Sequence, residues 1–148
     1  MPKFHMDLSL EGRYRGLHCT LVPTFESRFT ADWLIPHIEN VLVEIKEPMS
    51  LTAVQRALFG KNGERLVYEL EDTGELRALH ENLCNALEKN GLARILGRYS
   101  RENYKPHISD GKNICFPPGV EWVASRVRLV EMFKKGPNIT RCVWRIDE

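Results

Sequence analysis

Apolar and polar residues alternate along much of the chain, and this period of two predicts β-strands. Between Phe4 and Leu10 every second residue is apolar, as in a strand with one buried face. Six further stretches have a similar strand-like pattern: Arg15–Val22, Ser50–Phe59, Leu66–Leu70, Tyr104–Ser109, Val127–Phe133 and Ile139–Ile146. The turn residues Lys61-Asn62-Gly63 indicate that the third and fourth strands form a hairpin.

A second period, with apolar residues three or four positions apart, predicts two helices. The first helix would bury Leu34, Ile38, Val41, Leu42 and Ile45. Thr30 has a side chain suited to the N-cap, and Pro36 indicates that the regular helix either starts near that residue or bends there. The short run Val41–Val43 is also compatible with a strand.

The second helix has the clearer signals. Asp72 and Glu75 have the spacing of a capping box, and Gly91 is expected to end the helix. One face carries leucines at helical spacing, namely Leu76, Leu79, Leu83 and Leu87. This order of elements predicts one mixed α+β domain over residues 1–148, with a mostly antiparallel sheet and helices packed on one side.

Composition agrees with one globular domain. The chain has 148 residues, of which 43% are hydrophobic and 28% charged, values that exclude wholesale disorder and allow a sizeable core. A formal net charge of +1 disfavours a diffuse basic surface that wraps duplex nucleic acid, but it allows a small basic cleft. No apolar run approaches the roughly 18–20 residues that span a bilayer, and no secretory segment is evident at the N-terminus. We therefore expect a cytoplasmic protein that does not enter membranes.

The four cysteines, Cys19, Cys84, Cys115 and Cys142, are far apart in the sequence. No pair has the spacing of a zinc or redox motif, so free and mostly buried thiols are expected. A metal site built from His18, Cys19 and Cys115 is disfavoured because adjacent residues of a strand point to opposite faces. For the same reason Cys19 is a poor nucleophile beside His18, and we expect neither a metal nor another cofactor.

Two tripeptides, His18-Cys19-Thr20 and His107-Ile108-Ser109, place a hydroxyl two residues after a histidine in an expected strand. Side chains at i and i+2 of a strand point to the same face, about 6–7 Å apart. If the two strands are neighbours or are related by a pseudo-twofold axis, two imidazoles and two hydroxyls converge on one groove. The alternative is that each histidine is a partly buried strand residue with a satisfied hydrogen bond.

This set of groups suits displacement at phosphorus. Histidine can be neutral or protonated near neutral pH, so one imidazole can take a proton while the other gives one. The hydroxyls of Thr20 and Ser109 can donate hydrogen bonds to non-bridging phosphate oxygens. The candidate catalytic residues are His18, Thr20, His107 and Ser109.

The stretches Leu17–Leu21 and Tyr104–Ser109 resemble the two signature motifs of the two-histidine (2H) phosphoesterase superfamily, which includes 2′–5′ RNA ligase-like proteins and cyclic nucleotide phosphodiesterases. Leu58-Phe59-Gly60 and Val127–Val130 extend this similarity. It implies a bilobal, pseudo-duplicated, mostly antiparallel fold with outer helices and a central cleft. It also implies that the two motif histidines are catalytic and that the motif hydroxyls bind phosphate. Asp110-Gly111-Lys112 departs from the family pattern, because the strand would end there at once.

Further residues are candidates for substrate contacts. Aromatic side chains can stack on a base, and the candidates are Tyr14, Phe25, Tyr104 and Trp144. Tyr14 is the strongest of them, because alternation places it on the same face as His18. Lys105 alternates with His107 and could neutralise phosphate charge. His5 could reach the same groove, but an exposed edge position is the simpler interpretation, and His37 and His80 are interpreted as helix-surface residues.

The resulting hypothesis is a metal-independent phosphodiesterase whose partner is RNA or a small oligonucleotide or cyclic nucleotide. It would cleave a 2′,3′-cyclic phosphate or a 2′–5′ or 3′–5′ linkage, including those of cyclic or 2′–5′-linked signalling molecules. Two alternatives stay open: an inactive RNA- or nucleotide-binding module on the same fold, and a protein unrelated to phosphate in which both tripeptides are coincidental. The oligomeric state and the acid or base role of each histidine are left open.

Overall fold

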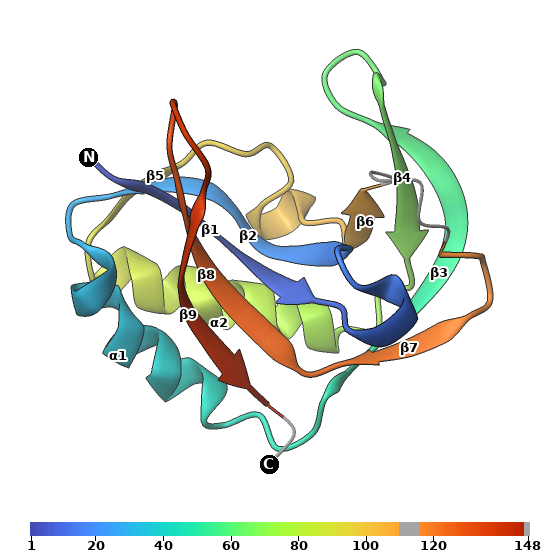
Figure 1. The fold of residues 1–148 in the computed structure, drawn as a ribbon, viewed down its shortest axis with the longest axis horizontal. Coiled ribbons are helices and arrows are strands. Elements are labelled where there is room, and N and C mark those ends of the chain that lie inside the picture. Colours follow the sequence, from blue (N-terminus) through green and yellow to red (C-terminus); the bar gives the residue numbers. More distant parts are fainter. Residues whose placement is uncertain (110–115, 147–148) are drawn as a thin grey trace.

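The computed structural model describes residues 1–109 and 116–146. The described chain contains nine strands, two α-helices and two short 3₁₀ helices (Figure 1). In chain order they are β1 (Lys3–Ser9), η1 (Gly12–Tyr14), β2 (His18–Ser27), α1 (Ala31–Leu42), β3 (Met49–Phe59), β4 (Arg65–Leu70), α2 (Glu75–Lys89), β5 (Leu92–Ile95), η2 (Arg101–Asn103), β6 (His107–Ser109), β7 (Glu121–Ala124), β8 (Arg126–Met132) and β9 (Ile139–Arg145).

The strands form one curled sheet in the order β7-β3-β4-β6-β2-β1-β8-β9, and β5 pairs with β2 beside this path. Every pairing among the described strands is antiparallel. Figure 1 shows two halves, one around β1, β2, β8 and β9 and the other around β3, β4 and β7. Strand β6 joins them because it pairs with β4 on one side and β2 on the other. The prediction of a bilobal, mostly antiparallel α+β fold is confirmed.

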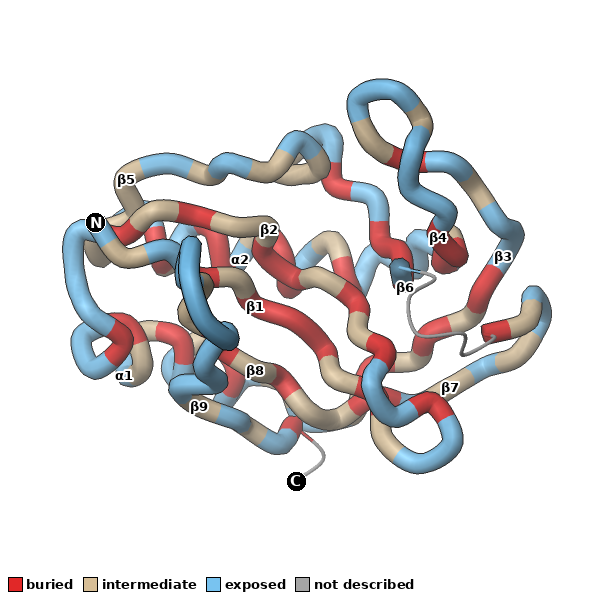
Figure 2. The backbone as a smooth tube through the Cα atoms, turned by 45° about the horizontal axis from the view of Figure 1, so that its top comes forward, coloured by how far each residue is buried: buried red, intermediate tan, exposed pale blue. Residues whose placement is uncertain are grey.

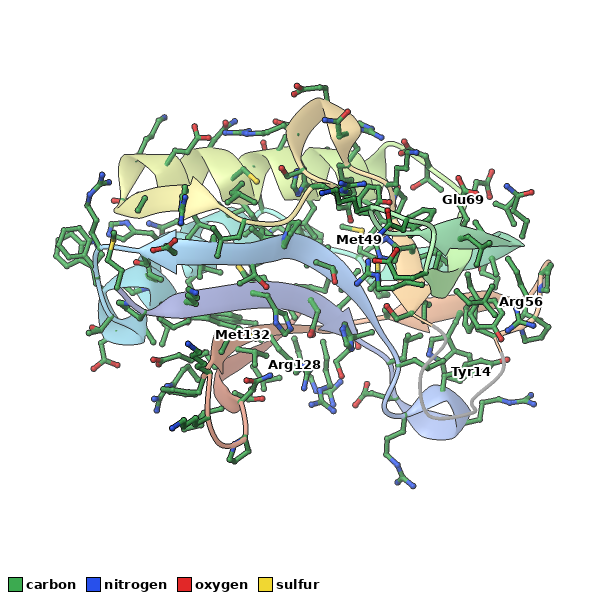
Figure 3. All side chains as sticks on the ribbon, turned by 90° about the horizontal axis from the view of Figure 1, so that it is seen from above. Tyr14, Met49, Arg56, Glu69, Arg128 and Met132 are labelled. Atoms are coloured by element: carbon green, nitrogen blue, oxygen red, sulfur yellow. The ribbon has the colours of Figure 1, made fainter. Side chains whose placement is uncertain are left out.

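Both helices cover the same face of the first half. Helices α1 and α2 contact each other, and α2 also contacts β2 and β5 (Figure 3). The alternation of β1 places Phe4, Met6 and Leu8 in the core with no exposed surface (Figure 2), and burial of each such side chain contributes about 1.5–3 kcal/mol. The alternate residues of β1 and β2 face away from the helices, and this opposite face carries the polar side chains.

The structure corrects the predicted details of both helices. Helix α1 runs through Pro36 and continues to Leu42. The alternative of a strand over Val41–Val43 is therefore wrong. Helix α2 begins at Glu75 without a capping box, because Gly74 occupies the N-cap with a left-handed φ of 85°. The Asp72 carboxylate instead accepts a hydrogen bond from the backbone N–H of Gly74.

The strand boundaries also differ from the prediction. The expected strand from Tyr104 shortens to the three residues of β6, and the short strands β5 and β7 were not predicted. Elements of three or four residues contain too few alternations to stand out in a sequence. Residues Asp110–Lys112 and Cys115, for which a strand end and a free thiol were expected, lie outside the described residues. Within the described residues, no helix is long and apolar enough to cross a membrane.

Candidate active site

The pairing of β2 with β6 brings the two histidine motifs together. Cys19 lies opposite Ile108 in this antiparallel pair, and both are fully buried. The same register sets His18 opposite Ser109 and Thr20 opposite His107. The two imidazoles therefore occupy one diagonal of a four-residue square, and the two hydroxyls occupy the other. Diagonal neighbours in such a pair are about 7–8 Å apart, close enough for both imidazoles to reach one phosphorus atom.

All four motif side chains line one cleft of about 600 Å³, within the roughly 300–1,000 Å³ of small-molecule sites. The predicted convergence of the motifs is therefore what the structure shows. The other lining residues come from β1, β2, the β3–β4 hairpin, the segment after β5 and the β8–β9 turn: His5, Pro23, Thr24, Gly60, Glu64, Arg65, Gly97, Arg98, Tyr99, Tyr104, Lys105, Met132 and Asn138.

His107 is held in one tautomer by the backbone. Its Nδ1 lies 2.8 Å from the carbonyl oxygen of Lys105, and because a carbonyl only accepts, Nδ1 is the donor. The neutral ring then has its lone pair on Nε2. The ring packs beside Phe59 and Tyr99, with centroid separations of 4.7 and 5.9 Å. Burial lowers the pKa of His107 below its usual value of 6.5, although the Lys105 carbonyl opposes the shift. These features suit a proton acceptor.

His18 has a different electrostatic environment. Its ring stacks on His5 at a centroid distance of 5.9 Å and an interplanar angle of 17°. Burial lowers the pKa of His18, while the nearby Asp7 carboxylate opposes this by favouring the protonated ring. No hydrogen bond from the described residues occupies its ring nitrogens, so both are available to a substrate. His18 thus differs from His107 in having a carboxylate close by that favours its protonated form.

Asp7 holds a fixed negative charge next to these rings. It is fully buried, and its two oxygens accept hydrogen bonds from Arg128 at 2.8 and 2.7 Å. Its Oδ2 also lies 2.9 Å from Nε2 of His5. Burial alone would raise the pKa of Asp7, but the hydrogen bonds from His5 and Arg128 outweigh it and lower the pKa to about 2. Asp7 therefore stays ionised under all ordinary conditions.

His5 lies in the cleft, so its interpretation as an exposed edge residue is wrong. Its Nδ1 contacts the sulfur of Met132 at 2.9 Å, and its Nε2 is the atom beside Asp7. Its side chain is 15% exposed. The antiparallel pairing of β1 with β2 sets His5 and Asp7 on the same face as His18 and Thr20, and this register could not be read from β1 alone.

The cluster His5, Asp7 and His18 deserves consideration as a metal site, because its ligand atoms lie within 4.8 Å of one another. Two imidazoles and a carboxylate can bind a divalent transition metal. However, both oxygens of Asp7 already accept hydrogen bonds from the Arg128 guanidinium. This positive charge opposes a second cation at the same carboxylate, so the cluster fits the positioning of His18 better than metal coordination.

Two of the predicted substrate-binding residues line the cleft. Lys105 is exposed, with its ammonium group 5.8 and 5.9 Å from the ring centroids of Phe59 and Tyr99. Tyr104 is only 2% exposed, and its ring stacks on His80 at 4.1 Å, so it offers no free face to a base. Its hydroxyl donates to the carbonyl oxygen of Thr20 at 2.9 Å, so Tyr104 positions the first motif instead.

The other three predicted stacking residues do not reach the cleft. Tyr14 and Phe25 are buried among aromatic core residues, and Trp144 donates from Nε1 to Glu39 beside helix α1. Figure 3 shows Tyr14, the last residue of η1, at the opposite end of the strands from the cleft residue Met132. The prediction for Tyr14 failed because β2 starts only at His18, and strand alternation does not hold through the preceding turn.

Helix α2 contains one further correction. His80 was interpreted as a surface residue, but it is fully buried. Its Nδ1 donates to the carbonyl of Leu21 at 2.6 Å, and its Nε2 accepts from the backbone N–H of Arg101 at 2.8 Å. With both nitrogens satisfied and burial lowering its pKa, His80 is a neutral structural link between α2 and the motif strand β2.

The chain is similar in sequence and in fold to known proteins. A family model described as the 2′-5′ RNA ligase superfamily matches residues 12–129, well over half of the chain. The crystal structure of E. coli LigT complexed with 3′-AMP superposes with a TM-score of 0.66 and 14% identity over 100% of both chains. A crystal structure of a phosphoesterase gives 0.64 and 13%, again over 100% of both chains. E. coli LigT complexed with NADP⁺ gives 0.63 and 14% over 99% of this chain and 98% of that one. No curated protein matches the sequence significantly.

Proposed function

Because this chain belongs to the 2′-5′ RNA ligase superfamily, a family of two-histidine phosphoesterases, we propose that it is a phosphodiesterase that acts on RNA ends or small oligonucleotides without a metal. The reacting group is a 2′,3′-cyclic phosphate or a 2′–5′ or 3′–5′ linkage. Nucleotide complexes of E. coli LigT, with 3′-AMP and with NADP⁺, support a nucleotide substrate for a cleft of the same fold.

One observation carries the proposal: the diagonal arrangement of two imidazoles and two hydroxyls across the β2–β6 pair, facing an open cleft. A phosphate centred between them can accept hydrogen bonds from Thr20 and Ser109 while one imidazole lies on each side. That is the geometry in-line displacement requires, since the nucleophile enters opposite the leaving oxygen.

The surroundings of the two rings suggest their roles. His107, with Nδ1–H fixed by the Lys105 carbonyl, takes the proton of the attacking water or ribose hydroxyl on Nε2. The attacking oxygen bonds to phosphorus, the bond to the leaving oxygen breaks, and protonated His18 gives its proton to that oxygen. The roles exchange in the reverse direction. Each proton transfer contributes about 10²–10⁴-fold.

The experiment is a product assay across 2′,3′-cyclic nucleotides, 2′–5′ oligoadenylates and cyclic dinucleotides. We expect turnover of at least one class, and we expect His18→Ala and His107→Ala each to lower kcat by at least about 10²-fold. Thr20→Ala and Ser109→Ala should each lower kcat by about 10²–10³-fold, the effect of removing one donor to a developing negative charge. His37→Ala is the matched control, because His37 lies on α1 outside the cleft.

Two results would contradict the proposal. Wild-type protein that binds nucleotides but releases no product from any of these substrates would indicate a binding module. Histidine variants that keep wild-type turnover would place the chemistry elsewhere.

A further inference from the structure

One side of the cleft carries basic residues that the two-histidine mechanism does not use. Arg65 begins β4 and Arg98 lies in the segment after β5, and both line the cleft together with Lys105. Three cationic side chains from three separate segments thus converge on one concave surface. Of these three residues only Lys105 was predicted to contact substrate, because Arg65 and Arg98 are not part of either histidine motif.

Arg65 and Arg98 differ from most of the described arginines because neither forms an ion pair with the described residues, although both lie close enough to the Glu64 carboxylate to lower its pKa. Elsewhere the described carboxylates neutralise arginine side chains at Arg77, Arg94, Arg101, Arg126, Arg128, Arg141 and Arg145. For Arg65 and Arg98 the described residues provide neither an ion pair nor a hydrogen bond. A guanidinium that faces a cleft and whose N–H groups make no hydrogen bond to the described residues can bind a phosphate through two parallel hydrogen bonds.

Glu64 is the acidic residue in this part of the cleft, and it does not cancel the positive charge. Its carboxylate folds back onto the β3–β4 turn, where it accepts a hydrogen bond from the backbone N–H of Asn62 at 2.8 Å. One carboxylate faces three cations, so the local balance is positive. A cleft lined by charge of one sign raises the local concentration of oppositely charged ligands, here anions.

The strand register places this charge beside the reacting phosphate. Val67 of β4 lies opposite Ser109 of β6, and Arg65 is two residues before Val67 on the same strand. That step is about 6–7 Å along the strand. The charge of Arg65 also acts on His107, whose pKa it lowers in addition to the larger effect of burial. Arg65 therefore lies one strand repeat beyond the residue that pairs with Ser109, and it lines the same cleft.

We propose that Arg65, Arg98 and Lys105 form a second anion subsite, and that the preferred substrate is a nucleotide or oligonucleotide carrying a second, terminal phosphate. This inference rests on the proposed function for the reacting phosphate and adds the class of its substrate. The second phosphate is not changed chemically. It aligns the substrate, so its effect falls on binding and on kcat/KM.

The first test is binding. Calorimetric titration compares adenosine 3′-monophosphate with adenosine 3′,5′-bisphosphate on the wild type and on Arg65→Ala, Arg98→Ala and the double variant. We expect the bisphosphate to bind at least about 10-fold more tightly to the wild type, as for one charged hydrogen-bonded contact. Each single variant should reduce this ratio, and the double variant should abolish it with the monophosphate affinity unchanged. Arg15→Ala removes an exposed arginine outside the cleft and should leave the ratio intact.

The second test is turnover of 2′–5′ diadenylate with and without a 5′-phosphate. A wild-type preference for the 5′-phosphorylated form, lost in the double variant, supports the subsite. Turnover without any preference overturns the subsite and leaves the phosphodiesterase function standing. Discrimination in binding, with no turnover of either compound or of any substrate in the product assay above, has the opposite meaning: the subsite stands and the proposed function fails. A loss of preference in Arg15→Ala as large as in Arg65→Ala also overturns the subsite, because net charge alone would then explain it.

Discussion

Replacing Asp7 with asparagine tests the charge network behind the active site. The substitution keeps the size of the side chain but removes the negative charge that Arg128 and His5 contact. We expect Asp7→Asn to lower the free energy of unfolding by about 2–3 kcal/mol at pH 7. We also expect it to alter the titration of His18, because the carboxylate favours the protonated form of that ring.

The magnitude follows from two observations. The pKa of Asp7 is lowered from 3.8 to about 2, and one pKa unit corresponds to about 1.4 kcal/mol, so the folded state favours the carboxylate by about 2 kcal/mol. Removing one partner of a buried ion pair costs about 3–5 kcal/mol. Here Arg128 is 25% exposed and can regain some water, which reduces that cost. For a chain of this length, 2–3 kcal/mol lowers Tm by about 5–10 °C.

The pH dependence gives a second readout with a definite sign. Because the folded pKa of Asp7 is lower than the unfolded one, its stabilisation is complete above about pH 4 and is lost as the pH falls toward 2. Denaturant unfolding of the wild type should show this loss, and Asp7→Asn should lack it. In the pH–rate profile, the limb controlled by His18 should move to lower pH in the variant, because its pKa falls further.

The matched control is Asp72→Asn. Asp72 forms an ion pair with Arg77 at 2.7 Å, but the two side chains are 41% and 36% exposed, and such surface pairs contribute about 0–1 kcal/mol. The reasoning is refuted if Asp7→Asn is as stable as the wild type at pH 7, or if it loses as much stability as the wild type between pH 4 and 2.

Three further predictions concern the cleft. Burial lowers the pKa values of both His18 and His107 below 6.5, so the pH profile of kcat/KM should be bell-shaped with its maximum below pH 6.5. The profile of kcat should peak at higher pH, because a bound phosphate anion raises the pKa values of both histidines. A kcat/KM maximum above neutral pH would contradict this prediction. EDTA should leave turnover unchanged, since Arg128 occupies both oxygens of Asp7; inactivation by EDTA that added Zn²⁺ or Mn²⁺ reverses would contradict it. Gly97→Ala should raise KM and lower the free energy of unfolding by about 1–3 kcal/mol, because the added Cβ would overlap the side chain of Pro23. Unchanged KM and Tm would contradict this prediction.

Local sequence patterns were sufficient to predict the two motifs and most of the strands around them. The period of a strand predicts that His18 and Thr20 share one face, as do His107 and Ser109. This prediction needs only neighbouring residues, and so does the resemblance of the two motifs to a known family. The same rule failed for Tyr14, because a 3₁₀ turn separates it from β2. Alternation within one strand is therefore reliable only as far as that strand extends.

Residues that reach the cleft from other strands could not be predicted in this way. His5 and Asp7 lie beside His18 because of the β1–β2 register, which depends on how two strands pair and not on either sequence alone. Arg65 depends in the same way on the pairing of β4 with β6. The burial of His80 also required the fold, since its hydrogen-bond partners are the backbone atoms of Leu21 and Arg101.

The three-residue strand β6 makes the distance between the imidazoles depend on a single backbone pairing. It connects the two halves of the sheet through its contacts with β2 and β4, so a small sliding of one half past the other would pull the proton donor away from the acceptor. A compound that wedges between the halves would therefore inhibit without touching either histidine. Amide hydrogen exchange along β6 and the facing part of β2 would report that separation.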